Sequence, residues 1–232
     1  MRETRGINLL ASYTLGRAQD HVSGLNIGGE QRPVLPVVIG DDASVERALT
    51  FEKGDALFDV RHRLVVSFSA ELPTPTQKGA VLRHLAGGWQ VNGIIQAQSG
   101  FPMTVFDPAL SIRYLTNRPN QTCDPNADAP HTVDQWFTTA CFVRRALADT
   151  AEPGSTPRNS VRGPGFARTD LSLFKNVDLA DTHRLQFRLE AFNLWNQERF
   201  GQPGNTLGAA TFGAITSAED GRIVQLGIKY TF

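Results

Sequence analysis

The sequence predicts an all-β fold: an antiparallel, up-and-down sheet of about six long strands that forms part of a transmembrane β-barrel wall. Three observations predict it. Apolar and polar residues alternate over segments of about nine to twelve residues. The connections between these segments alternate between longer and shorter ones. No helical period of comparable strength occurs in the 232 residues.

Composition excludes two classes of protein. Lys and Arg number 23, and so do Asp and Glu, so the chain lacks the basic surplus of a nucleic-acid binder. The sequence contains no run of 18 or more apolar residues, which a membrane-spanning helix requires, so a helical membrane protein is also excluded. A membrane β-barrel is compatible with this composition, because its strands face lipid with only every second residue.

Each expected strand has one apolar face. Apolar residues, with Gly93, occupy the odd positions of 7–15 and 89–98 and the even positions of 63–72. In 170–178 the alternation is weaker, because Lys175 interrupts it. Segment 184–195 alternates from residue 185 to residue 191, and both of its faces become apolar near its end. Segment 224–232 is the clearest, with apolar residues at Val224, Leu226, Ile228, Tyr230 and Phe232.

The connections are long, short, long, short and long. They contain about 47, 16, 71, 5 and 28 residues and span residues 16–62, 73–88, 99–169, 179–183 and 196–223. Structureless loops of such length are uncommon in compact soluble domains. Outer-membrane barrels combine short periplasmic turns with long extracellular loops, so this alternation favours a barrel.

The faces opposite the apolar ones are polar. Side chains of this kind together suit a water-filled or plugged lumen, although for any single one a solvated sheet face is the better interpretation. The predicted lumen-facing residues are Arg63, Glu71, Gln90, Asn92, Gln96, Gln98, Arg184, Gln186, Arg188 and Glu190.

Aromatic residues fall near the ends of the expected strands. If the last strand descends to the periplasm, Trp89, Tyr230 and Phe232 lie at the inner interface, and Tyr13 and Trp195 lie near the outer one. These are the levels of the aromatic girdles of membrane barrels. Lys175 then lies near the periplasmic end of a lipid-facing strand, where its ammonium can reach the lipid headgroups.

The two cysteines and the loop acids leave alternatives open. Cys123 and Cys141 lie in a loop rich in Pro, Asn and Asp, and either a disulfide or two free thiols fits their spacing. Four loop acids, Asp107, Asp124, Asp128 and Asp134, lack the order of a calcium-binding loop. We therefore expect no metal site and no cofactor.

Nothing in the sequence predicts an enzyme. The five histidines show no metal-binding spacing, and neither a nucleophile elbow nor a phosphate-binding glycine loop occurs. Asp59 with His62 has the residue types of an acid–base pair, but a polar cluster at a loop end fits better. The residues from Arg162 to Gly165 suit either a ligand-contacting loop or a turn before a strand.

Seven motifs carry a resemblance to a known family. They are FDVRHRL (58–64), GGWQVNGI (87–94), QSGFP (98–102), NSVRGPGF (159–166), DLSLFKN (170–176), LQFRLEAFNLWN (185–196) and FGAITSA (212–218). Together they resemble the C-terminal barrel of Oar-like TonB-dependent outer-membrane receptors, which carry a carboxypeptidase-regulatory-like domain. The similarity covers nearly the whole chain. The alternation that ends at Phe232 also resembles the C-terminal signal read by the barrel-assembly machinery.

The resemblance implies a function and a set of partners. Residues 1–232 would form the C-terminal part of a receptor barrel in the bacterial outer membrane, without catalysis. The partners would be outer-membrane lipid, the remainder of the barrel and its plug, TonB through an N-terminal part, the assembly machinery and an extracellular ligand of unknown class. Since the motifs of a signal peptide, regulatory domain, plug and TonB box are not found, we expect a fragment or a mis-assigned start.

Two other readings stay open at this point. A surface-adhesion or binding barrel without transport has the same fold, and its outer loops would perform the binding. A soluble β-sandwich has the same alternation, with the apolar face turned into its core.

Overall fold

A six-stranded antiparallel sheet dominates the computed structural model, which describes residues 6–23, 38–73, 79, 84–108, 118–145, 154–180 and 182–232. Its strands are β1 (Ile7–Leu15), β4 (His62–Glu71), β5 (Trp89–Gln98), β10 (Phe166–Ala180), β11 (His183–Phe192) and β12 (Ile223–Thr231), in that order across the sheet. This is the predicted up-and-down arrangement. All six predicted strands are confirmed, although β10 begins at Phe166 and β11 ends at Phe192, before Trp195.

The strand register separates a polar face from an apolar face. Residues directly opposite each other in an antiparallel pair lie on the same face of the sheet. Arg63 is opposite Gln98, Glu71 is opposite Gln90, and the same pairing continues through β10 to β11 and β12. All ten residues predicted to line a lumen therefore lie on one face of the sheet.

The apolar face of the sheet is exposed. On β12, Leu226 is 80% exposed and Ile228 is 70% exposed. The other sheets of the described residues are two-stranded, so none of them is large enough to cover this face as the second layer of a sandwich would. The structure therefore does not support the soluble β-sandwich.

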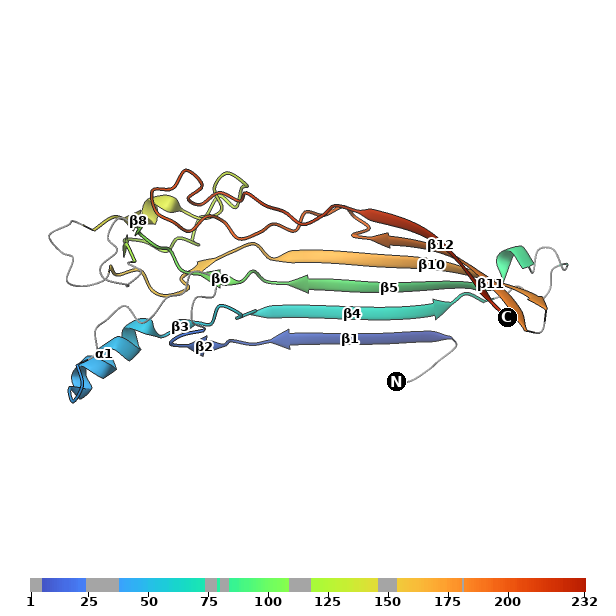
Figure 1. The fold of residues 1–232 in the computed structure, drawn as a ribbon, viewed down its shortest axis with the longest axis horizontal. Helices are drawn as coiled ribbons and strands as arrows, with labels where there is room; N and C mark the ends of the chain where they lie inside the picture. The colour runs from blue at the N-terminus through green and yellow to red at the C-terminus, as the bar shows by residue number, and fades with distance from the viewer. Residues whose placement is uncertain are drawn as a thin grey trace.

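The two ends of the sheet differ, as Figure 1 shows. β10 ends and β11 begins at one end of the sheet, where β1 also begins and β12 ends. At the other end lie the described parts of three long connections, residues 16–61, 99–165 and 193–222, which we call the loop layer. Long and short connections therefore alternate as predicted.

The loop layer contains short elements that the sequence did not predict. The first long connection carries β2 (Gln19–Asp20), helix α1 (Asp42–Glu52) and β3 (Gly54–Asp55). The second carries β6 (Pro102–Met103), β7 (Asn120–Gln121), the 3₁₀ helix η2 (Thr139–Cys141), β8 (Phe142–Val143) and β9 (Val161–Arg162). β2 pairs with β3, β6 with β9 and β7 with β8.

Helix α1 forms although its sequence lacks an apolar stripe. Its buried residues, Ser44, Ala48 and Glu52, are spaced by four and so lie on one face. Two of the three are polar, which is why hydrophobic periodicity does not reveal the helix. Asp41 caps the N-terminus, where its side chain accepts a hydrogen bond from the Ala43 N–H at 3.2 Å. Neither this helix nor any other helix of the described residues is long and apolar enough to cross a membrane.

The apolar core of the described residues lies in the loop layer and not on the sheet. Its buried members are Met103, Val105, Phe137, Cys141, Phe142 and Val161. Phe212, from the third long connection, meets Phe137 edge to face with the ring centroids 5.4 Å apart. A disulfide joins Cys141 to Cys123, with 5.0 Å between their Cα atoms. The loop layer is therefore a packed structure with its own core.

Candidate ligand-recognition site

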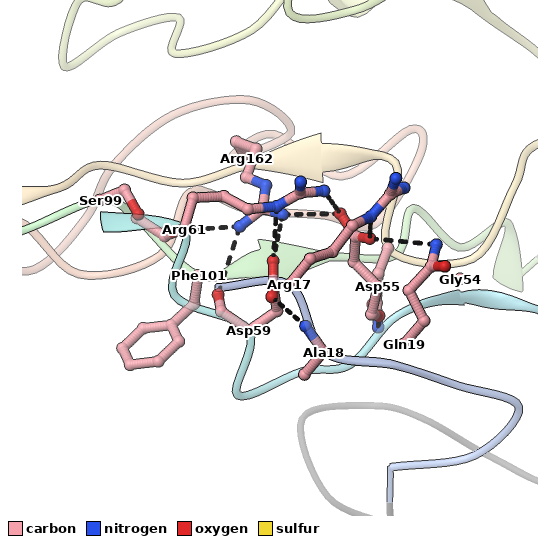
Figure 2. Close-up of polar contacts among 12 residues, drawn as sticks. Arg17, Ala18, Gln19, Gly54, Asp55, Asp59, Arg61, Ser99, Phe101 and Arg162 are labelled. Carbon is pink, nitrogen blue, oxygen red and sulfur yellow. Dashed lines mark hydrogen bonds and ion pairs between the residues drawn. The ribbon is translucent and has the colours of Figure 1, made fainter. Parts of the chain in front are cut away.

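Five charged residues form a cluster where the loop layer meets the sheet. They are Arg17, Asp55, Asp59, Arg61 and Arg162, and Figure 2 shows their side chains converging. We call them the aspartate–arginine cluster. Four come from the connection between β1 and β4, and Arg162 comes from β9 in the next long connection. The cluster therefore joins two loops that are distant in sequence.

Two carboxylates hold three guanidinium groups in this cluster. Arg61 donates to Asp55 Oδ2 at 2.6 Å through Nη2 and to Asp59 Oδ2 at 2.9 Å through Nε. Arg162 Nη2 lies 2.6 Å from Asp55 Oδ2 and 2.5 Å from Asp59 Oδ2. Arg17 Nε lies 2.9 Å from Asp55 Oδ1. Charge-assisted bonds of this kind are among the strongest in proteins.

The cluster also binds backbone groups of the loops. Asp59 is 1% exposed, and its Oδ1 accepts from the Ala18 N–H at 2.6 Å. Arg162 Nη1 donates to the carbonyl oxygens of Asp59, at 3.2 Å, and of Gly100, at 3.3 Å. These bonds fix the chain where it leaves β1 and β5, so the cluster positions the loops that follow both strands.

The cationic neighbours set the protonation state of both carboxylates. Burial by itself would raise the pKa of Asp55, but hydrogen bonds from Arg61, Arg17 and Arg162 outweigh it and lower the pKa from 3.8 to about 2. Burial likewise opposes a lowered pKa of Asp59, and the Ala18 N–H and Arg162 outweigh it. The Asp55 carboxylate in turn raises the pKa of Arg61. Asp55, Asp59 and Arg61 are thus ionised at neutral pH.

A second set of buried ion pairs fastens α1 to the loop layer. Arg118 Nη2 lies 3.0 Å from Glu52 Oε1, and both side chains are almost fully buried. The Arg118 guanidinium also lies 4.1 Å from the centroid of the Phe51 ring. Arg158 donates through Nε to the Glu52 carbonyl at 2.8 Å and through Nη2 to the Asp20 side chain. A cation at the C-terminal end of a helix is favoured by the helix dipole.

Close backbone approach explains two of the glycines around the cluster. A Cβ atom on Gly165 would lie 2.5 Å from the carbonyl oxygen of Gln98, which is closer than real Cβ atoms come. A Cβ atom on Gly100 would overlap the Gly163 carbonyl in the same way. The chains leaving β5 and entering β10 therefore pass too closely for any side chain. This supports the reading of residues 162–165 as a turn before a strand, with Arg162 as an anchor.

An apolar pocket opens next to the cluster. It has a volume of about 550 Å³ and is lined by Ser23, Leu57, Phe58, Phe101, Pro102, Met103, Gln202, Pro203 and Asn205. All three long connections contribute to this lining. We call it the Phe58–Phe101 pocket. A second hollow of about 350 Å³ lies against the middle of β1, β4, β5 and β10 and is lined in part by Ser69, Asn92 and Ser172 of the polar face.

A family model described as "Outer membrane beta barrel domain" matches residues 1–225. The chain belongs to this family. It is thus an outer-membrane β-barrel protein, located in the bacterial outer membrane. No curated protein and no solved structure matches the chain.

The structure of this barrel protein places the predicted aromatic residues at both ends of the sheet. Tyr13 lies toward the loop layer on β1, and exposed Trp195 lies beyond the end of β11. Trp89 begins β5 at the opposite end, where Tyr230 and Phe232 close the chain. The hydroxyl of Tyr13 bonds to His62 Nδ1 at 2.7 Å, and that of Tyr230 bonds to His183 Nδ1 at 2.6 Å. A girdle role for these five residues stays a prediction.

Lys175 differs from the expectation of a headgroup contact. Its ammonium donates to the carbonyl oxygens of His84, at 2.5 Å, of Leu85, at 3.4 Å, and of Gly87. It also lies 5.4 Å from the centroid of the Trp89 ring, directly across the strand pair. The backbone before β5 therefore satisfies this charge, because it folds back over the strand end.

The other sequence candidates are not brought together. Asp59 and His62 do not bond to each other, since His62 Nδ1 meets Tyr13 and Asp59 belongs to the cluster. Asp107 pairs with Arg144 at 3.0 Å, and Asp124 bonds to the Asn126 N–H. Within the described ranges, no group of three or more His, Cys, Asp or Glu side chains could hold a metal ion.

Sequence reasoning missed most of the aspartate–arginine cluster. The polar cluster expected at Asp59 is present, but its members Asp55, Arg61 and Arg17 were not predicted as partners of Asp59. Asp55, Asp59 and Arg61 lie within seven residues of one another, but their partner Arg162 is about 100 residues away. Charges that are this distant in sequence give no pattern of their own, so only the fold brings them together.

Proposed function

We propose that this chain forms a wall segment of a TonB-dependent outer-membrane receptor. The sheet supplies the lipid-facing wall and the lumen lining, and the loop layer recognises an extracellular ligand. The chain carries out no catalysis. Energy for uptake comes from TonB through a plug that occupies the lumen, and the barrel-assembly machinery inserts the strands.

The observation that carries this proposal is a sheet whose two edge strands pair with no further strand among the described residues and whose one face is mainly polar. β1 and β12 stand at the two edges, so each must pair with a further strand in a closed barrel. The smallest single-chain barrels have about eight strands, and TonB-coupled barrels have ~22 with a plugged lumen. In a large barrel with a plug, further strands pair with β1 and β12, and the plug contacts the polar face.

The polar face has the hydrogen-bonding capacity that a plug surface needs. Gln90 Nε2 donates to Ser69 Oγ at 3.1 Å and to Asn92 Oδ1 at 2.8 Å. Arg188 Nε donates to Gln186 Oε1 at 2.6 Å. Amide, hydroxyl and guanidinium groups arranged in this way can bind either water or the backbone of another segment. This supports a lumen role for the polar face.

The proposal is tested with the complete gene product in a Gram-negative host. We expect alkali-resistant retention in the outer membrane and heat-modifiable migration on a gel, which together report a closed barrel. Formaldehyde treatment of the cells should then give a covalent adduct with TonB that is missing in a matched strain without TonB.

A barrel that inserts normally but gives no TonB adduct would contradict the transport proposal. It would favour an adhesion or binding barrel without transport. That second candidate has its own supporting observation, because the packed core of the loop layer makes a rigid outer surface on which a binding partner could dock.

A further inference from the structure

We propose that the Phe58–Phe101 pocket is the primary ligand site and that it takes an uncharged, mainly apolar small molecule with a planar ring and a hydrogen-bond donor. This inference deepens the proposed receptor function and rests on it. The pocket combines suitable size, apolar walls and rigid support.

The size and lining of the pocket determine the ligand class. Its volume of about 550 Å³ lies within the roughly 300–1,000 Å³ that is typical of small-molecule sites. Two aromatic rings, Phe58 and Phe101, form its walls with Met103. None of the described residues that line it carries an ionisable side chain. A charged ligand would therefore lose its hydration without gaining an ion partner there, which is unfavourable.

The polar groups of the pocket indicate a donor on the ligand. Asn205 Nδ2 donates to the Thr104 carbonyl at 2.8 Å, which orients the amide. Oδ1 is the acceptor atom of this amide. An N–H or O–H of the ligand is the complementary group.

The surrounding bonds hold the pocket walls in place. The Leu57 N–H donates to Ser23 Oγ at 2.8 Å, and the Phe106 N–H donates to the Asn205 carbonyl at 2.9 Å. The Phe101 carbonyl accepts from the Gly163 N–H at 2.9 Å, next to Arg162 of the aspartate–arginine cluster. Walls that are fixed before binding reduce the entropy lost when a ligand binds.

Phe58 is the ring best placed to meet an incoming ligand. It is 64% exposed, although its neighbours Leu57 and Asp59 are half-buried and buried. A phenyl ring held at the mouth of an apolar pocket can stack on a planar ring of the ligand. Since it is so exposed, its replacement should leave the fold intact.

The probe for the test is dansylamide, an uncharged naphthalene sulfonamide that fluoresces more strongly and at shorter wavelength in apolar surroundings. It is titrated into outer-membrane vesicles that contain the complete gene product. Naphthalene-1-sulfonamide serves as the dark competitor, so that specific binding is separated from partition into lipid. We expect a saturable, competable component for the wild type.

Two variants identify the site. Phe58→Asp removes the stacking ring and places a charge beside the bound apolar ligand, so it should weaken binding roughly ten-fold or more. The control is Val133→Asp, which puts the same charge on an exposed apolar residue elsewhere in the loop layer. It should leave the affinity unchanged. A wild type without a competable component, or a Phe58→Asp variant with unchanged affinity, would overturn the proposal.

The two proposals fail in distinguishable ways. Dansylamide binding needs neither TonB nor energy, so the pocket stands if binding is found and the TonB adduct is not. If the adduct forms and dansylamide does not bind, the receptor function stands and the ligand site lies elsewhere.

Discussion

Individual ion pairs of this protein differ in how much they contribute to its stability. Arg162 bonds to the buried Asp59 carboxylate, to the partly buried Asp55 carboxylate and to two backbone carbonyls, so its loss would leave Asp59 inside the protein with fewer donors. Arg184 pairs with Asp178 where both side chains are more than half exposed. Exposed pairs contribute little to stability, whereas breaking a buried one is costly.

Replacement of Arg162 tests this difference. We expect Arg162→Ala to destabilise the loop layer by about 2–4 kcal/mol, because the buried Asp59 carboxylate and the partly buried Asp55 carboxylate lose a cation. Hydrogen exchange should rise in β9 and in residues 99–101, with the sheet unaffected. Arg184→Ala is the matched control, and exchange in the loop layer should stay at the wild-type level. Equal effects of the two variants would contradict the anchoring role.

Acid should break the ion pairs of Asp55 in the aspartate–arginine cluster over a defined pH range. The pKa of Asp55 is lowered from 3.8 to about 2, so its stabilisation is fully present above pH 4 and is lost as the pH falls toward 2. Trp136 reports this change, because its Nε1 donates to the Arg162 carbonyl at 3.0 Å. In a 5-fluorotryptophan spectrum, its resonance should shift between pH 4 and pH 2. An Asp55→Asn variant should lose this transition, and an unchanged transition would refute its assignment to Asp55.

At the scale of single elements, α1 depends on a buried ion pair more than on apolar contacts. Glu52 is buried against Arg118 at its C-terminal end, whereas Glu46 is exposed on the same helix. The position of α1 in the loop layer therefore depends on the ion pair between Glu52 and Arg118.

Glu52→Ala should detach α1 from the loop layer. The buried Arg118 guanidinium would lose its carboxylate, which costs about 3–5 kcal/mol. Limited proteolysis should then cleave within residues 42–52. Glu46→Ala removes an exposed carboxylate from the same helix and should leave the protease resistance unchanged. Resistance of the Glu52→Ala variant would show that the ion pair does not hold the helix.

Strand β5 contains a glycine whose place is taken by a neighbouring ring. A Cβ atom on Gly93 would lie 2.5 Å from Cε1 of Phe68, directly across the strand pair. We expect Gly93→Val to lower the heat-modifiable fraction, because the ring must leave this position. The double variant Gly93→Val with Phe68→Ala makes room and should recover it. If the heat-modifiable fraction of the double variant does not recover, the assembly defect comes from the strand backbone and not from the ring contact.

At the scale of the whole molecule, the two faces of the sheet meet different surroundings. Leu226 and Gln225 are neighbours on β12 and point to opposite faces. Leu226 is exposed on the apolar face, and Gln225 donates to Glu190 Oε2 at 3.0 Å on the polar face. A membrane barrel requires lipid on one side and polar contacts on the other.

The same charge placed on each face tests this arrangement. Leu226→Arg should reduce the alkali-resistant, heat-modifiable protein, since an arginine facing lipid at mid-depth costs about 2–4 kcal/mol. Gln225→Arg should assemble normally, because Glu190 lies across the strand pair as an ion partner. Equal assembly of both variants would contradict lipid contact on the apolar face.

Sequence alone determined the sheet of this protein. Alternation over six segments predicted the strands, their two faces and the alternation of long and short connections, because strand geometry depends on residues two positions apart. The local pattern also placed Trp89 and Tyr13 at opposite ends. Helix α1 was not predicted, since its buried face is made of Ser44, Ala48 and Glu52 and gives no apolar period.

Only the tertiary structure decided the site. The link between Arg162 and Asp55, the bond of Arg158 to Asp20 and the walls of the Phe58–Phe101 pocket all join segments from separate connections. Contacts between such distant residues arise because the strands bring the long connections together at the same end of the sheet. The physical reason is that periodicity is a property of neighbouring residues, whereas ion pairs and pockets depend on positions that the whole fold sets.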